Sequence, residues 1–198
     1  MLWVGWFGFN AGSALAADGN AGMAAVVTHI SAATASLVWM IMDWSKFGKP
    51  TLIGLVTGTI AGLASITPAS GSVGPIGALI IGASAGFVCY LFVNVVKNKF
   101  KIDDSLDVFA VHGVGGLIGI LLVAFLVDSN FGGAGYADGL NAISQLLIQL
   151  KGTFAVLVLS VVASIIITYV VKFTVGLRVD ESSEVEGLDI SSHGETNG

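Results

Sequence analysis

The sequence predicts an all-α polytopic membrane protein, and three observations carry that prediction. Hydrophobic residues make up 55% of the 198 positions and charged residues only 11%, whereas soluble domains carry roughly 25% charged residues. The hydrophobic residues fall into six apolar segments, and the mean hydropathy is +0.90. The 27 glycines are spread through these segments, as expected where membrane helices pack closely.

Each of the six segments is expected to form a helix, because turn or charge signals separate them. They cover residues 1–17, 21–44, 51–67, 73–96, 108–127 and 152–175. The first is short for a membrane span, which needs about 20 residues, and it begins without a cap or a flanking charge. We therefore expect that the chain begins inside a helix and is a fragment. Residues 128–149 are expected to be a loop and residues 181–198 a polar tail without a core of its own.

Basic residues predict the orientation of the helices. The second and fourth connections and the end of the last helix are basic, and apart from Lys151 the intervening connections have no Lys or Arg. Since basic residues favour the cytoplasmic side, these connections and the C-terminus are expected in the cytoplasm. The residues concerned are Lys46, Lys49, Lys97, Lys99, Lys101, Lys172 and Arg178.

Small residues recur at a spacing of four on several predicted helices, which lets helix backbones approach closely. The positions are Gly54, Gly58 and Gly62, then Gly82 and Gly86, and then Gly115 and Gly119. The single cysteine, Cys89, excludes an internal disulfide and a cysteine metal site. We expect it to be a small buried residue.

His112 is the most informative residue, because it lies in an apolar segment long enough to cross a bilayer. An ionisable group at membrane depth is costly and normally faces a cavity, a pore or a partner. Imidazole also exchanges its proton near neutral pH. Asp104 and Asp107 precede this segment, where carboxylates can cap free N–H groups and complement the helix dipole.

Four motifs, in order, resemble the Amt/MEP/Rh family of ammonium transporters, on the Amt side, over essentially the whole chain. They are Trp-Phe-Gly-Phe-Asn-Ala-Gly-Ser at 6–13, the segment 62–69 around Thr67-Pro68, the segment 103–113 ending in His112-Gly113, and the tail at 176–179 and 186–195. The resemblance implies a fold of eleven membrane helices in trimers with one pore per subunit. This chain then corresponds to roughly helices six to eleven, with the sixth truncated.

The resemblance also implies roles for single residues. Phe9 matches a phenylalanine that gates the outer pore mouth, Ser13 matches a serine that hydrogen-bonds ammonium, and His112 matches one of two paired pore histidines. Thr67, Asp104 and Asp107 are expected to be structural residues near the pore, while Asp189 and His193 are expected in a regulatory tail. The domains are then a membrane domain at 1–178 and a cytoplasmic tail at 179–198.

The expected function is ammonium or ammonia transport across the plasma (cell inner) membrane by a multi-pass homotrimer, with a PII-type signal protein as a possible cytoplasmic partner. The alternatives are an ammonium sensor built on a transporter domain, or an inactive fragment. No nucleophile–base pair, metal cluster or phosphate loop suggests an enzyme, a cofactor or a nucleic-acid partner. Other readings stay open: Phe9 can be core filler, Ser13 can bond its own helix, and Trp6 and His29 are expected to pack.

Overall fold

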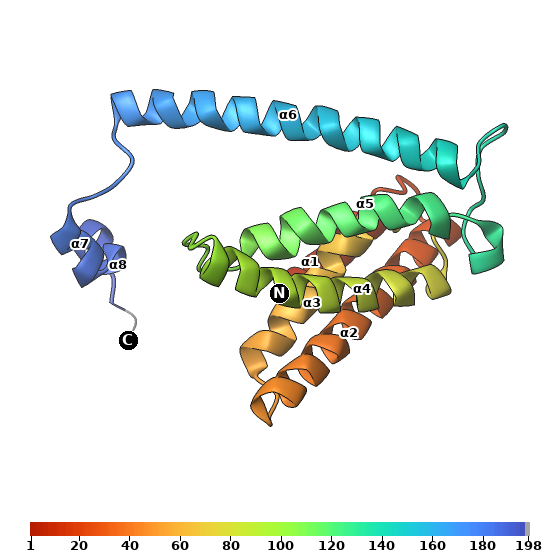
Figure 1. Cartoon of the computed structure of the whole chain (residues 1–198), viewed down its shortest axis with the longest axis horizontal. Coiled ribbons are helices and arrows are strands. Elements are labelled where there is room, and N and C mark those ends of the chain that lie inside the picture. The colour runs from red at the N-terminus through yellow and green to blue at the C-terminus, as the bar shows by residue number, and fades with distance from the viewer. Residues whose placement is uncertain (197–198) are drawn as a thin grey trace. The chain divides into compact units, whose positions relative to one another are not determined.

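A computed structural model of the chain describes residues 1–196, and all regular structure in that range is helical (Figure 1). The prediction of an all-α chain with several apolar helices is therefore confirmed. The chain divides into two compact units, Met1–Thr153 and Phe154–Gly198. The long helix α6 (Ala142–Thr174) crosses this division, and we describe each unit by itself.

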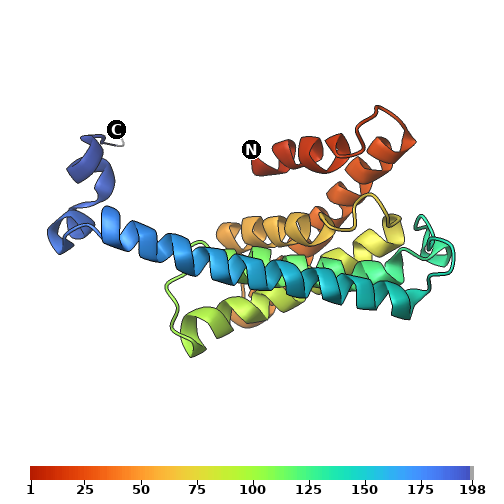
Figure 2. The ribbon, with the colours of Figure 1, turned by 90° about the horizontal axis from the view of Figure 1, so that it is seen from above.

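The first unit is a bundle in which α2 packs against α3 and α4, and α3 packs against α4 and α5. The shorter α1 packs against α2 and α3. Helices α4 and α5 lie side by side in both ribbon views (Figures 1 and 2). The bounds are α1 (Leu2–Gly12), α2 (Gly19–Phe47), α3 (Leu52–Ile66), α4 (Pro75–Asn94), the π-helical η1 (Val95–Lys99) and η2 (Phe109–Val114), α5 (Gly115–Leu126) and the short 3₁₀ helix η3 (Ser129–Phe131).

Side-chain caps define where several helices begin. Asp18 accepts hydrogen bonds from the backbone N–H groups of Asn20 and Ala21 at the start of α2. Thr51 does the same for Gly54 at the start of α3. Such caps satisfy N–H groups that have no partner inside the helix. At the other end of α2, Gly48 adopts the left-handed conformation at φ 74 and stops the helix.

Four helices are long and apolar enough to cross a membrane, namely Gly19–Phe47, Pro75–Lys99, Phe109–Leu126 and Ala142–Thr174. Leu52–Ile66 is apolar but shorter. The predicted end of the first helix near residue 17 is wrong, because α1 ends at Gly12. The chain has to turn before Asp18, which is extended at φ −129 so that it can cap α2.

The predicted loop at 128–149 is also wrong in its second half, since α6 begins at Ala142. The side chain of Asn141 accepts hydrogen bonds from the N–H groups of Ile143 and Ser144. The Ser144 hydroxyl accepts one in return from the N–H of Asn141. This reciprocal cap starts the helix among polar residues that carry no hydrophobic signal.

The glycines that are spaced four residues apart lie where helices cross, as predicted. A Cβ atom on Gly62 or on Gly82 would lie 2.5 Å from the Ser31 carbonyl oxygen, so α3 and α4 both approach α2 at that residue. A Cβ on Gly119 would lie 1.8 Å from the Ser65 carbonyl oxygen, which marks the crossing of α5 and α3. Cys89 is fully buried beside Trp39 and Tyr90 in one of the core clusters, as expected.

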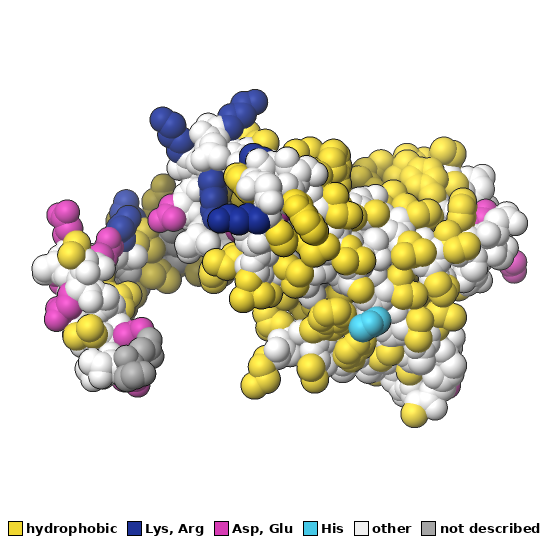
Figure 3. All heavy atoms as spheres, turned by 90° about the horizontal axis from the view of Figure 1, so that it is seen from below, with side chains coloured by type: hydrophobic (Ala, Val, Ile, Leu, Met, Phe, Trp, Pro, Cys, Tyr) yellow, Lys and Arg dark blue, Asp and Glu magenta, His cyan; other side chains and the backbone are white. Residues whose placement is uncertain are grey.

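The surface of the molecule is strongly apolar. Figure 3 shows hydrophobic side chains over most of the visible face of the bundle, with Lys and Arg side chains gathered at one end. Large residues such as Leu37, Ile53 and Phe87 are exposed on the helices that can cross a membrane. An apolar belt with basic residues at one end is the distribution expected of a multi-pass membrane protein.

The second unit contains the rest of α6 and two six-residue helices, α7 (Glu181–Glu186) and α8 (Leu188–His193). The Asp180 carboxylate caps α7, and hydrogen bonds from Ser182 and Ser183 lower its pKa to about 2. Arg178 forms a two-pronged ion pair with Glu184, and this contact lowers the pKa of that carboxyl group. The predicted polar tail thus contains two short helices, and none of its residues from 181 to 196 is buried.

Candidate functional site

His112 lies in the π-helical segment η2, which runs directly into α5. Single π turns inside α-helices are rare and frequently occur at functional sites. The start of this segment is held by Asp104, whose two carboxylate oxygens accept hydrogen bonds from the N–H groups of Val108 and Phe109 at 2.8 and 2.9 Å. The imidazole itself is exposed in this chain. It is therefore open to further groups at membrane depth.

Asp107 holds the same segment through a different contact. Its carboxylate forms an ion pair with the Lys97 ammonium group at 2.7 Å, and thereby links η1 to the chain that enters η2. Its backbone has a φ of 57, which only a few per cent of non-glycine residues adopt. Asp104 thus binds backbone N–H groups at the start of the segment that carries His112, and Asp107 ties the residues just before that segment to Lys97 of η1.

Trp6 joins His112 to two other helices. Its indole ring stacks on the His112 ring with centroids 6.2 Å apart and planes 8° apart. Its Nε1–H donates a hydrogen bond of 2.7 Å to the hydroxyl of Thr67, the residue that ends α3. The Thr67 hydroxyl in turn donates to the Leu63 carbonyl oxygen at 2.8 Å. Side chains of α1, α3 and η2 therefore meet at Trp6.

Phe9 and Ser13 follow Trp6 on α1 and just beyond its end, at the i+3 and i+7 positions of one helix face. The Phe9 side chain is 63% exposed. Trp6 and Phe9 line an apolar groove of about 490 Å³ together with Met1, Leu2 and Gly5. This face of α1 therefore presents an indole, a phenyl ring and then a hydroxyl in order along the helix.

The Ser13 hydroxyl donates a hydrogen bond of 2.7 Å to the carbonyl oxygen of Phe9. The alternative that this serine bonds its own helix is therefore correct. A hydroxyl has one donor and two acceptor lone pairs. Since the donor is used within the helix, the exposed Ser13 oxygen presents acceptors, which is the polarity that a cation with N–H groups requires.

The other predicted residues lie apart from this face. His29 stacks on Trp3 and Phe7 at centroid distances of 5.1 and 6.2 Å, so it packs on aromatic rings of α1 as expected. Asp189 and His193 belong to α8 in the second unit.

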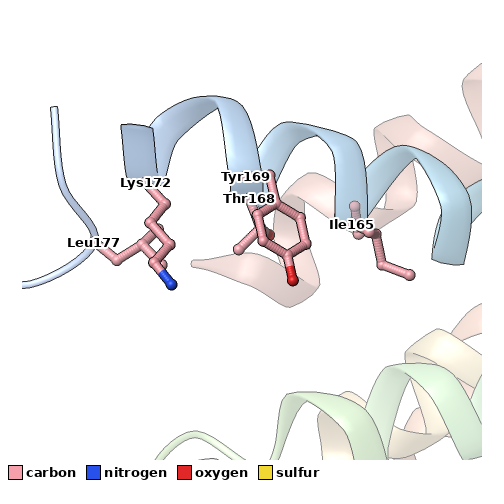
Figure 4. Close-up of a pocket in the computed structure, with 6 residues that line it drawn as sticks. Ile165, Thr168, Tyr169, Lys172 and Leu177 are labelled. Carbon is pink, nitrogen blue, oxygen red and sulfur yellow. The ribbon is translucent and has the colours of Figure 1, made fainter. Parts of the chain in front are cut away.

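A second groove, of about 340 Å³, lies along one face of α6 and the turn after it (Figure 4). Lys172 and Tyr169 border it, and Tyr169 stacks on Phe173 with centroids 6.0 Å apart. None of the predicted site residues lines it. Among residues 1–196, no group of three or more His, Cys, Asp or Glu side chains is placed to hold a metal ion.

From the sequence, Trp6 was expected only to pack, and its contact with His112 was not predicted. Its signal was present in the spacing, because residues 6, 9 and 13 share one helix face. That spacing alone does not distinguish a face turned to the core from a face turned to a pathway. The contact with His112, 106 positions later in the chain, joins this helix face to the predicted site residue, and the spacing alone does not show it.

Two curated proteins have sequences similar to that of this chain. The chain is 47% identical over 196 residues to an ammonium transporter of Aquifex aeolicus, covering 98% of this chain and 46% of that protein. It is 48% identical over 196 residues to the ammonium transporter Amt1 of Archaeoglobus fulgidus, covering 98% of this chain and 49% of that protein. The chain thus spans about half the length of the curated relatives it matches.

Two solved structures are also similar to this chain. A protein described as Sensor Amt Protein superimposes with a TM-score of 0.87 at 32% identity, over 96% of this chain and 46% of that one. Mep2 of Saccharomyces cerevisiae superimposes with a TM-score of 0.78 at 35% identity, over 91% of this chain and 46% of that one. The family model described as Ammonium Transporter Family matches residues 1–198. With this match and these relatives, the chain belongs to the ammonium transporter family.

Proposed function

We propose that this chain forms part of the wall of a pore that transports ammonium or ammonia across a membrane. The observation that carries the proposal is the order of side chains along α1 and η2: the Ser13 hydroxyl, the exposed Phe9 ring, and then Trp6 stacked on His112. At a rise of about 1.5 Å per residue, Ser13 and Phe9 are about 6 Å apart along the helix axis and Phe9 and Trp6 about 4.5 Å.

The outer part of this series suits a cation. Moving an ammonium ion out of water into an apolar space is prohibitive unless other groups replace its hydration shell. The free lone pairs of Ser13 can accept N–H groups, and the face of the Phe9 ring can attract the positive charge. These two groups would form the entrance and the phenylalanine gate that the family resemblance implies.

The inner part suits neutral ammonia and a separate proton. Beyond Phe9 the groove is apolar, which favours an uncharged molecule over an ion. An imidazole can both accept and donate a proton, and His112 is exposed in this chain. In the proposal, a second histidine from elsewhere in the assembled pore faces that edge, and the pair binds ammonia and relays the proton.

The family resemblance supplies the rest of the proposal. It comprises a homotrimer in the plasma (cell inner) membrane, a membrane domain at 1–178 and a cytoplasmic tail at 179–198 that binds regulators of the PII type. The basic connections after α2 and α4 support a cytoplasmic assignment for that end of the bundle. Asp189 and His193 in α8 are the tail residues proposed to take part in regulation.

A chimera tests whether the chain can serve as pore wall. Residues 1–198 would replace the matched 196-residue segment of Archaeoglobus fulgidus Amt1 in a cell that lacks its own ammonium transporters. We expect methylammonium uptake and growth on limiting ammonium, and we expect the His112→Ala version of the same chimera to lose both. A chimera that assembles in the membrane but transports nothing, while the parent Amt1 does, would refute the proposed function.

A further inference from the structure

Thr67 has an unusual pair of contacts for a residue at the end of a helix. Its hydroxyl donates to the Leu63 carbonyl oxygen at 2.8 Å, so its hydrogen is committed, and it accepts the indole N–H of Trp6 at 2.7 Å. The two bonds define the position of the oxygen and the direction of the lone pair that meets Trp6. Thr67 therefore specifies where the nitrogen end of the indole lies.

The other contact of that indole is with His112. The two rings are nearly parallel, with an angle of 8° between their planes. In the described residues, no hydrogen bond is formed by the His112 imidazole itself. The indole of Trp6 is thus the aromatic ring that lies parallel to the imidazole, and a shift of the indole would change the plane that it offers to His112.

We propose that Thr67 is a positioning residue for His112 and acts through the indole of Trp6. The hydrogen bond holds the indole, and the indole holds the imidazole in the plane in which it meets substrate. This inference rests on the proposed function, because it assigns a role in the same pathway. A proton relay depends on the alignment of donor and acceptor, so the orientation of His112 affects the transport rate.

The chain contains a matched control for the loss of such a hydrogen bond. The Thr28 hydroxyl donates to the Ala24 carbonyl oxygen at 2.6 Å and accepts a hydrogen bond from the Asn10 side chain at 2.9 Å. It thus ties α1 to α2 by the same chemistry with which Thr67 ties α1 to α3. In the described residues, neither a hydrogen bond nor a ring contact connects this pair with His112. Thr28→Val and Thr67→Val therefore remove equivalent bonds on different sides of α1.

The test uses the protein expressed from its native gene and measures methylammonium uptake. A misplacement of 1 Å costs on the order of a hundredfold in rate, so a displacement of a fraction of that should cost about tenfold. We expect Thr67→Val to lower uptake about tenfold, and Thr67→Ser, which keeps the hydroxyl, to restore most of it. Thr28→Val should lower uptake less than about threefold at equal amounts of protein in the membrane.

The effect of Thr67→Val is then measured in a Trp6→Phe protein, because this substitution keeps an aromatic ring on His112 but removes the N–H donor. If Thr67 acts through that donor, Thr67→Val should have no further effect on uptake in the Trp6→Phe protein. A second full tenfold loss in that background, or equal losses in Thr67→Val and Thr28→Val, would overturn the inference.

A measurement that does not depend on transport separates this inference from the proposed function. The ¹⁵N shifts of the His112 side chain, assigned by comparison with His112→Ala, report how its two nitrogens are protonated and bonded. We expect these shifts to change in Thr67→Val and to be unchanged in Thr67→Ser and Thr28→Val. Wild-type protein without uptake would refute the proposed function, and the shifts would still decide the role of Thr67. Identical His112 shifts in all variants would refute that role.

Discussion

Replacing Gly119 by alanine should separate α5 from α3 and destabilise the bundle. The new Cβ would lie 1.8 Å from the Ser65 carbonyl oxygen and 2.9 Å from Pro68 Cγ. Moving it from 1.8 Å to the 3.4 Å at which ordinary contact begins requires a shift of about 1.6 Å. The obstacle is backbone of a neighbouring helix, which cannot rotate away as a side chain can. Overpacking of this kind typically costs about 1–3 kcal/mol, and we expect the upper part of that range.

Gly116, one turn earlier on the same helix, is the matched control, because a Cβ there would meet nothing within 4 Å. Both substitutions gain the same helix propensity of about 1 kcal/mol, which cancels in the comparison. Gly119→Ala should therefore be about 2–3 kcal/mol less stable than Gly116→Ala. This corresponds to a Tm lower by roughly 4–12 °C.

The assay is thermal unfolding of both variants in the same detergent. Gly119→Ala should also lower uptake, because α5 continues directly from the segment that carries His112. A Gly119→Ala protein as stable as Gly116→Ala would refute the close crossing of α3 and α5. A stable variant with normal uptake would show in addition that the pathway tolerates movement of α5.

Three further predictions concern the site and the tail. His112→Ala should abolish or qualitatively change uptake. It should leave Tm within about 2 °C, because the imidazole is exposed and forms no hydrogen bond with another described residue. Unchanged uptake and currents would remove His112 from the mechanism. The Asp180 cap of α7 should be present above the usual carboxyl pKa of 3.8 and be lost only as the pH falls through about 2, since a lowered folded pKa protects the charged form. NMR titration should show this, with Ser182→Ala raising the pKa of Asp180, whereas a pKa near 3.8 in the intact protein would contradict the cap. Deleting the residues after Arg178 should lower uptake or remove its response to a PII-type protein while trimers still assemble; unchanged uptake and response would make the tail a solubilising appendage.

The helices could be predicted from the sequence because their signals are local. Runs of apolar residues and the caps or glycines between them predicted six helical segments, and the structure has helices in all six. The errors lie at the ends, where polar side chains decide. Asn141 and Ser144 start α6 earlier than hydropathy indicates, and the cap at Asp18 makes α1 end sooner. The role of the glycines spaced four residues apart could also be predicted, since small residues on one helix face have few roles other than the close approach of helices.

The candidate site was harder to predict from the sequence, because its contacts join residues far apart in the chain. Trp3 and Trp6 are equivalent in the sequence, as two indoles in one short apolar segment. In the structure Trp3 stacks on His29, whereas Trp6 stacks on His112 and bonds Thr67. Trp3 and Trp6 lie three residues apart, which places them only about 60° apart around the helix axis, so a modest rotation of α1 would change which ring faces His112 without changing any local signal. The rotation is set by the packing of α1 on α2 and α3. Local sequence thus predicts that a histidine and several aromatic residues share the membrane, and helix packing decides which ring faces His112.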